Sequence, residues 1–272
     1  MRVHHSLGKA TKANVHNDPF PHILVENALD EDLLGALIET LPSPEVLAKG
    51  TPLGSNKHFS RGWEDEVVPQ LWKEFLQLHI TQEFYARVIE LVGDGIKELH
   101  PNIEEKYGPL EELTVGKRGF ETFKEGKDIL LEAQMFVQTP VVGKPNSYRI
   151  GHVDDPSKLY NGLLYLRLPG DDSVGANLEL LRYKGKKKKF HNKLRKLIDD
   201  RYVEVVKTIP YKANTFVLLP CSLYSLHGVQ VRQKTKWPRY YMNTLGELPE
   251  PLFSLEPYWE NSFDAVRRKL GI

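Results

Sequence analysis

The chain has one cysteine, Cys221, among its 272 residues. A single cysteine cannot form an internal disulfide, and it cannot supply the cysteine pairs of a structural zinc site. Residues 1–13 contain no apolar segment typical of a secretory signal, and no Asn-x-Ser/Thr sequon occurs. No apolar run approaches the ~20 residues that span a bilayer. We therefore expect a cytoplasmic protein with no membrane partner.

The chain also lacks an excess of charge of either sign. It contains 37 basic and 36 acidic residues, which gives a formal net charge of +1. Such a chain has no overall field that attracts nucleic acid, so a nucleic-acid partner is not expected. The length and the 40% hydrophobic content suit one domain, residues 1–272, with a substantial core. The sequence does not indicate an oligomeric state.

Several catalytic motifs are absent. The chain has no Gly-x-Ser-x-Gly, no Walker A loop and no His-Glu-x-x-His. The pair Gly93 and Gly95 has no third glycine and follows a helical pattern, which argues against a dinucleotide site. Cys221 lies in Leu-Leu-Pro-Cys-Ser, which predicts a buried strand end and therefore an inert thiol. Hydrolases and nucleotide-binding enzymes of these classes are thus disfavoured.

The N-terminal part of the chain predicts a strand followed by helices. Residues 1–18 are polar and include three histidines, and we expect a loose arm or an added first strand there rather than a metal site. Phe20–Val25 predicts a short strand, and the apolar spacing from Leu33 to Leu41 predicts an amphipathic helix. Residues 43–65 resemble a loop. Residues 66–99 keep an apolar stripe at helical spacing, which we expect to pack against a sheet.

From about residue 128 the pattern changes to short strands separated by Gly, Pro, Asp, Asn and Lys. Such spacing indicates a sandwich or a barrel rather than a βαβ sheet. The expected strands are Ile129–Val137, Gly162–Leu168, Ala176–Tyr183, Tyr202–Ile209, Thr215–Leu219, Tyr224–Val231 and Arg239–Leu245.

A basic insertion, residues 184–202, interrupts these strands. Its apolar residues suggest a short helix, and a solvated loop and helix face is the favoured interpretation. The alternative is a lid, or an anchor for an anionic substrate or partner. The basic residues are Lys184, Lys186–Lys189, Lys193, Arg195 and Lys196, and the apolar ones are Phe190, Leu194, Leu197 and Ile198.

The segment Gly151-His152-Val153-Asp154 carries the chemistry that we consider most informative. In an extended segment the residues i and i+2 point to the same face, so His152 and Asp154 can reach one metal ion together. His227 lies in a later β-type stretch and is the candidate third ligand. Two histidines and one carboxylate form the facial triad of non-heme Fe(II) oxygenases.

Further residues follow in a characteristic order. The features are His152-Val-Asp154, Leu163-Leu-Tyr165-Leu, the Gly175–Leu180 strand, Leu218-Leu-Pro220, and His227-Gly-Val229 followed by Arg239. With the opening Pro19–Val25 segment and its helix, this order resembles the 2-oxoglutarate/Fe(II)-dependent dioxygenase superfamily, close in style to its prolyl-hydroxylase-like group. The resemblance covers about two-thirds of the chain.

The resemblance implies a fold that is mainly β with flanking helices (α+β), built on a double-stranded β-helix, which is a jelly-roll or cupin-like barrel. It divides the chain into a supporting region 1–127, a core 128–247 that contains the insertion 184–202, and a C-terminal extension 248–272. It implies Fe(II) held by His152, Asp154 and His227, with 2-oxoglutarate and O2 as cosubstrates, and it allows ascorbate as well.

The resemblance also implies an arginine that pairs with the distal carboxylate of 2-oxoglutarate, because a guanidinium donates two parallel hydrogen bonds. We expect this arginine to be Arg239, with Arg232 as a competitor. Tyr165 is expected to add a hydroxyl to the cosubstrate site, although packing inside the barrel explains it equally well. Gln134 and Asn161 are weaker candidates near the iron or the substrate.

A surface loop is the favoured interpretation of Arg61 and Trp63, and a border of the substrate pocket is the alternative. The resulting expectation is a dioxygenase that hydroxylates an unactivated C–H bond of a small molecule or amino-acid-like substrate, releasing succinate and CO2. Asp154 argues against halogenation, because related halogenases lack this carboxylate. The alternatives are the same chemistry on a protein or peptide residue, and a non-catalytic jelly-roll binding module.

Overall fold

The computed structural model describes residues 2–147 and 150–270 of the chain. Its helices are α1 (Glu31–Glu39), α2 (Pro44–Ala48), α3 (Gln70–Leu78), α4 (Gln82–Leu99), α5 (Ile103–Tyr107) and α6 (Ser262–Leu270). Its strands are β1 (Val15–His16), β2 (His22–Glu26), β3 (His58–Gly62), β4 (Val115–Lys117), β5 (Ile129–Gln138), β6 (Lys158–Tyr165), β7 (Leu178–Tyr183), β8 (Phe190–His191), β9 (Leu197–Ile198), β10 (Val203–Ile209), β11 (Thr215–Pro220), β12 (His227–Val229) and β13 (Arg239–Glu247).

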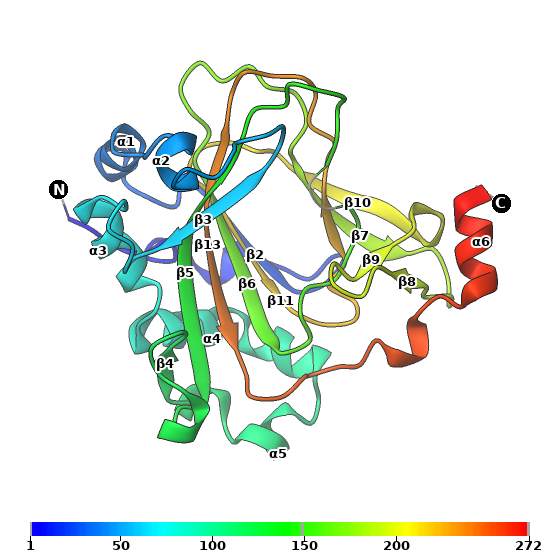
Figure 1. Cartoon of the computed structure of the whole chain (residues 1–272). Coiled ribbons are helices and arrows are strands. Elements are labelled where there is room, and N and C mark those ends of the chain that lie inside the picture. The colour runs from blue at the N-terminus through cyan, green and yellow to red at the C-terminus, as the bar shows by residue number, and fades with distance from the viewer. Residues whose placement is uncertain (1, 148–149, 271–272) are drawn as a thin grey trace.

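Two sheets form the core of the molecule (Figure 1). The larger sheet has the order β1-β2-β11-β6-β13-β5-β3, and β4 adds to it beside β5. The smaller sheet has the order β10-β7-β12. All pairings in the two sheets are antiparallel except that of β4 with β5. A separate pair, β8 and β9, lies at the side of the smaller sheet, next to α6.

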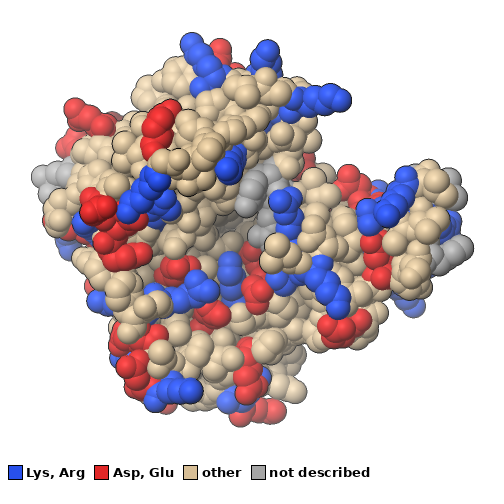
Figure 2. Space-filling model, in the orientation of Figure 1, with Lys and Arg blue, Asp and Glu red and all other residues tan. Residues whose placement is uncertain are grey.

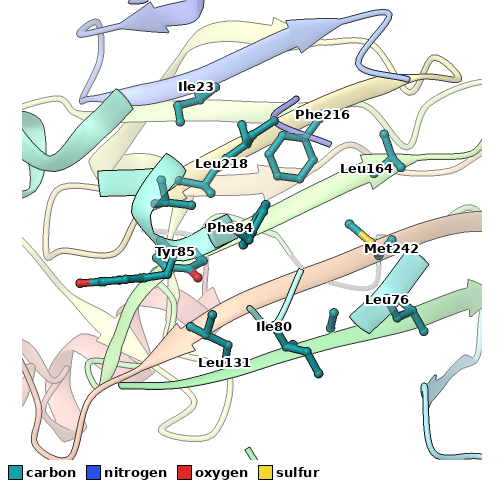
Figure 3. Close-up of a cluster of buried hydrophobic side chains, with 14 of the residues drawn as sticks. Ile23, Leu76, Ile80, Phe84, Tyr85, Leu131, Leu164, Phe216, Leu218 and Met242 are labelled. Carbon is teal, nitrogen blue, oxygen red and sulfur yellow. The ribbon is translucent and has the colours of Figure 1, made fainter. Parts of the chain in front are cut away.

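One face of the larger sheet packs against helices. Side chains of β5, β6, β11 and β13 meet those of α3 and α4 in one apolar cluster, drawn in Figure 3. The cluster includes Phe84 and Tyr85 from α4, and Leu218 and Met242 from the sheet, all fully buried. This burial explains why the long α4 is stable although its opposite face is polar.

The other face of the larger sheet packs against the smaller sheet. Because successive strand residues alternate between faces, the neighbours of the helix-facing residues form a second cluster. It joins Tyr165, Val217 and Tyr241 of the larger sheet to Leu178 and Leu180 of β7. The fold is thus mainly β with flanking helices, as expected, and its two antiparallel sheets fit a jelly-roll core.

Most of the expected strands are present with shifted ends. The largest shift is in β6, which spans Lys158–Tyr165 where we expected Gly162–Leu168. We did not predict the first residues of this strand because Lys158 and Asn161 are polar. Both face a cavity rather than the apolar core. The expected strand Tyr224–Val231 is shorter, at His227–Val229. The helical stretch is divided into α3 and α4 at Thr81, whose hydroxyl accepts a hydrogen bond from the amide of Phe84.

Two expectations were wrong, and a third is decided in favour of one of its two alternatives. Residues 2–18 do not form a loose arm: Leu7 and Ala10 are buried, and β1 pairs with β2, which agrees with the alternative of an added strand. Residues 43–65 are not only loop, because Ser43 caps α2 and the segment also contains the edge strand β3. The basic insertion forms the β8–β9 hairpin instead of a helix. Its turn places Asn192 and Lys196 at positive φ, which disfavours a helix.

The surface carries both signs of charge. On the face shown in Figure 2, Lys and Arg alternate with Asp and Glu around a central hollow. No helix among the described residues is long and apolar enough to cross a membrane.

Candidate metal and cosubstrate site

The two candidate histidines face each other across a main-chain bridge. The His152 amide donates to the His227 carbonyl at 2.9 Å, and the His227 amide donates to the His152 carbonyl at 3.0 Å. This pairing joins residue 152 to β12 and sets the two ring centroids 4.2 Å apart. Residues 75 positions apart in the chain thereby lie side by side.

Asp154 completes the cluster. It follows His152 by two residues, and its Oδ2 lies 3.5 Å from His227 Nε2. One potential ligand atom from each of the three residues lies within 4.8 Å of the other two. At most 5% of any of the three residues is exposed. Within residues 2–147 and 150–270, this is the one cluster of His, Cys, Asp or Glu able to hold a metal ion.

Main-chain carbonyls orient both imidazole rings. His152 Nδ1 lies 2.8 Å from the Ile150 carbonyl, and His227 Nδ1 lies 3.0 Å from the Ser225 carbonyl. A ring that donates from Nδ1 keeps the Nε2 lone pair available for a metal. In both cases the carbonyl belongs to the residue two positions earlier, so the local main-chain geometry fixes the ring.

An amide pair orients the carboxylate. Asn161 Nδ2 donates to Asp154 Oδ2 at 2.9 Å. Asn243 Nδ2 in turn donates to Asn161 Oδ1 at 2.6 Å, and to the Gly162 carbonyl at 2.9 Å. Asn161 is therefore beside the candidate metal site, as we expected, whereas the supporting Asn243 was not identified from the sequence.

A cavity of about 260 Å³ contains the cluster and extends between the two sheets. Residues of β5, β6 and β13 form its wall on the larger sheet. The lining residues are His58, Phe136, Gln138, His152, Asp154, Lys158, Asn161, Leu163, Leu178, His227, Val229, Arg239, Tyr241 and Asn243.

Arg239 lines this cavity and is only 2% exposed. Its guanidinium carbon lies 4.8–5.2 Å from the ring centroids of Tyr165, Tyr211 and Tyr241. Among the described residues its one side-chain hydrogen bond goes from Nη1 to Gln138 at 3.4 Å, and its Nε and Nη2 have no hydrogen-bond partner there. A buried guanidinium with two unused donors matches a carboxylate guest.

Tyr165 lies beside Arg239 and is fully buried. Its hydroxyl has no hydrogen-bond partner of ordinary geometry in the part of the chain that the structure describes. Burial raises the pKa of Tyr165, and the positive charge of Arg239 partly opposes this shift. The hydroxyl therefore remains protonated and can donate to an anionic guest.

Arg232 is equally buried but has a different environment. Its Nη1 donates to Asn56 Oδ1 at 2.9 Å and to the Thr139 carbonyl at 3.1 Å, and its Nη2 donates to the Trp237 carbonyl at 2.8 Å. Burial and the nearby positive Arg239 lower the pKa of Arg232 to about 10. These bonds connect loops, so Arg232 serves the fold.

The remaining candidates lie elsewhere. Gln134 shares a face of β5 with Gln138 but does not line this cavity. Trp63 packs against Phe120 at 5.0 Å, and Arg61 pairs with Asp65 at 3.4 Å, also outside it. Two of the three N-terminal histidines contact other rings, and His4 lies 3.4 Å from Asp30.

His58 also lines the cavity, although no sequence feature predicted that it would. It lies on β3, in the stretch expected to be loop, and its Nε2 lies 2.6 Å from the hydroxyl of Tyr241. Its ring also packs on Phe136 at 4.8 Å. No motif includes it, because only the pairing of β3 with β5 brings it to the cavity.

No protein-family model and no curated protein matches this chain. Among solved structures, a prolyl 4-hydroxylase from Phytophthora capsici is 13% identical to this chain, with a TM-score of 0.47. The match covers 92% of this chain and 66% of that one, which is just under two thirds of its length. A prolyl-4-hydroxylase from Pseudomonas putida is 12% identical to this chain, with a TM-score of 0.40. The match covers 84% of this chain and 93% of that one.

A prolyl hydroxylase from Trichoplax adhaerens, solved with a peptide fragment of hypoxia inducible factor, is 13% identical with a TM-score of 0.42 and covers 83% of each chain. These are the kinds of protein that the sequence resemblance led us to expect. Because all these TM-scores are below 0.5, we infer the chemistry of this chain from its own side chains.

Proposed function

We propose that this chain is an Fe(II)- and 2-oxoglutarate-dependent dioxygenase that hydroxylates an unactivated C–H bond. One observation carries the proposal: a single cavity is lined both by a buried His-Asp-His cluster and by a buried arginine with two donors that have no partner among the described residues. A metal site alone would fit many proteins, and a buried arginine alone would fit many anions. Together they match a metal with a carboxylate-bearing cosubstrate.

His152, Asp154 and His227 would hold the iron. Two imidazoles and one carboxylate leave further coordination positions open, which suits Fe(II) oxygenases. When bound, iron and 2-oxoglutarate supply the oxidising power from O2, with release of succinate and CO2. Asn161 keeps the carboxylate oriented, and the Ile150 and Ser225 carbonyls keep the imidazoles oriented.

Arg239 and Tyr165 would bind the distal carboxylate of the cosubstrate. Both are buried in a region surrounded by apolar and aromatic side chains, where a charge-assisted hydrogen bond is stronger than in water. The chain thus contributes orientation and charge complementarity.

The size of the cavity supports a small substrate group. Its volume, about 260 Å³, is below the ~300–1,000 Å³ of typical small-molecule pockets, and the cosubstrate would use part of it. The space that is left suits a small molecule or an amino-acid-like substrate. His58, Lys158 and Asn243 are polar residues of the lining that do not belong to the metal cluster, and they would orient the substrate.

The decisive test is anaerobic addition of Fe(II) and 2-oxoglutarate to the purified protein. We expect the weak visible charge-transfer band of a complex of iron with a 2-oxo acid. His152→Ala and Arg239→Ala should lose or weaken it. His16→Ala is the matched control, since His16 stacks on His22 away from the cavity.

A folded wild-type protein that retains no iron and gives no band would contradict this proposal. That outcome would favour the non-catalytic binding module. A band that persists in Arg239→Ala would leave iron binding intact but remove Arg239 from the cosubstrate site.

A further inference from the structure

The basic insertion lies directly against the segment that carries the metal ligands. Leu197 of β9 forms a bridge with His152, and the Ile198 amide donates to the Gly151 carbonyl at 2.8 Å. Lys196 Nζ also pairs with Asp155 Oδ2 at 2.8 Å. The short segment around His152 therefore has β12 on one side and the insertion hairpin on the other.

Lys188, two residues before β8, contacts three tyrosine rings beside the hairpin. Lys188 Nζ lies 4.8 Å from the ring centroid of Tyr183, 5.4 Å from that of Tyr224 and 5.7 Å from that of Tyr258. Aromatic faces attract an ammonium group at such distances. Lys188 is half-buried there, whereas its neighbours Lys186 and Lys187 are exposed.

The C-terminal segment supports the same hairpin. Lys189 Nζ pairs with Asp264 of α6 at 2.9 Å, and the Glu260 amide donates to the Phe190 carbonyl at 2.9 Å. Phe190 also forms a bridge with Trp259. These contacts link residues 184–202 to residues 258–264, as Figure 1 shows at the side of the smaller sheet.

We propose that the insertion hairpin is a clamp for the metal centre and that Lys188 is its positioning residue. The proposal rests on the metal site proposed above. Among the described residues His152 lies outside the regular strands, and isolated bridges to His227 and Leu197 join its main chain to its two neighbours. If the hairpin left its place, the segment around His152 would lose the Leu197 bridge and the Ile198 hydrogen bond, and metal affinity depends on such supporting contacts.

The test compares Lys188→Ala, Lys188→Arg and Lys187→Ala. The first readout is hydrogen exchange at the Ile198 amide, which reports whether the hairpin is in place. The second is the affinity for Mn(II) alone, a redox-stable substitute for Fe(II). We expect Lys188→Ala to exchange at least tenfold faster at Ile198 and to bind Mn(II) three- to tenfold more weakly. Lys188→Arg keeps the cation and should restore both values, and Lys187→Ala should match the wild type.

Two results would overturn the clamp. One is an unchanged Ile198 exchange rate in Lys188→Ala. The other is faster exchange with an unchanged Mn(II) affinity, which would make the hairpin irrelevant to the metal. A wild-type protein that binds no Mn(II) would instead overturn the metal site itself, together with the clamp that depends on it.

Discussion

Arg232 and Arg239 are two buried arginines near one cavity, and their surroundings differ. The guanidinium of Arg232 donates to one side chain and two main-chain carbonyls. That of Arg239 lies among tyrosine rings with two unused donor atoms. Both terminal nitrogens of Arg232 are used by the protein and only its Nε has no partner among the described residues, whereas Arg239 has one long hydrogen bond and two unused donors. Removing each should therefore have a different effect.

We expect Arg239→Met to weaken 2-oxoglutarate binding by at least ~100-fold, because a buried charged contact to a carboxylate is lost. The free energy of unfolding should change by less than ~1 kcal/mol, since lost ring contacts are offset by removal of unpaired donors. Urea unfolding and calorimetric titration measure the two quantities.

Arg232→Met is the matched comparison. Its carbonyl partners would lose their donors, so we expect a loss of ~2–3 kcal/mol in unfolding free energy. A large loss of stability in Arg239→Met would instead show that Arg239 mainly stabilises the fold.

The sequence reveals some site residues better than others. The i, i+2 spacing of His152 and Asp154 predicts a shared face from local geometry alone. Strand parity could not separate Arg232 from Arg239, because a turn intervenes after His227. His58 and Gln138 were missed because their place in the cavity depends on pairings of distant strands.

At the scale of elements, the metal cluster depends on the close approach of β12 to residues 150–152. Gly228 makes this approach possible. A Cβ built there would lie 3.0 Å from the Gly151 nitrogen and 3.1 Å from the Ile150 carbonyl carbon. Both are main-chain atoms, so the two segments would have to separate.

We expect Gly228→Ala to weaken Mn(II) binding by roughly tenfold or more and to cost ~1–3 kcal/mol of unfolding free energy through this overpacking. Gly35→Ala is the control. Gly35 lies in α1, and a Cβ added there would meet nothing within 4 Å, so alanine should stabilise the helix by ~0.5–1 kcal/mol. Equal Mn(II) affinity in Gly228→Ala and the wild type would contradict the close-approach argument.

Elements with a strong apolar pattern were the predictable ones. β5, β11 and α4 have long apolar patterns and follow the expectation closely. The edge strand β3 was missed because most of its residues are only half-buried and show no alternation. The β8–β9 hairpin was mistaken for a helix because Phe190, Leu194, Leu197 and Ile198 happen to have helical spacing, although Leu194 is 86% exposed.

At the scale of the whole molecule, buried neutral histidines connect the outer parts to the core. The hydroxyl of Ser6 in the N-terminal arm lies 2.9 Å from His79 Nε2, and the Ser6 amide donates to the same nitrogen at 3.0 Å. Burial lowers the pKa of His79 to about 3 and that of His22 to about 4. Protonation of either residue is therefore linked to unfolding.

We expect stability to fall as the pH falls from 7 to 5. The unfolded chain takes up protons on these histidines near pH 6.5, whereas the folded chain does not until pH 3–4. The stabilisation is thus complete above about pH 6.5 and decreases below it, by roughly 2 kcal/mol per histidine at pH 5. Carboxylates whose pKa is lowered in the folded chain affect stability at pH values below this range.

Urea unfolding at both pH values checks this expectation. His79→Gln should be less stable than the wild type at pH 7, but its decrease between pH 7 and pH 5 should be smaller by about 2 kcal/mol. An identical decrease in both proteins would show that His79 is not the titrating group.

The order of strands in the larger sheet has a consequence for biosynthesis. Within the described residues the strands that pair with β2 are β1 and β11, and β5 pairs with β13, which comes about 100 residues later in the chain. A nascent chain that has not yet exposed residues 215–247 beyond the ribosome cannot complete either pairing. The N-terminal half would then present open strand edges for much of translation. Chains truncated before β11 should aggregate rather than accumulate as folded intermediates.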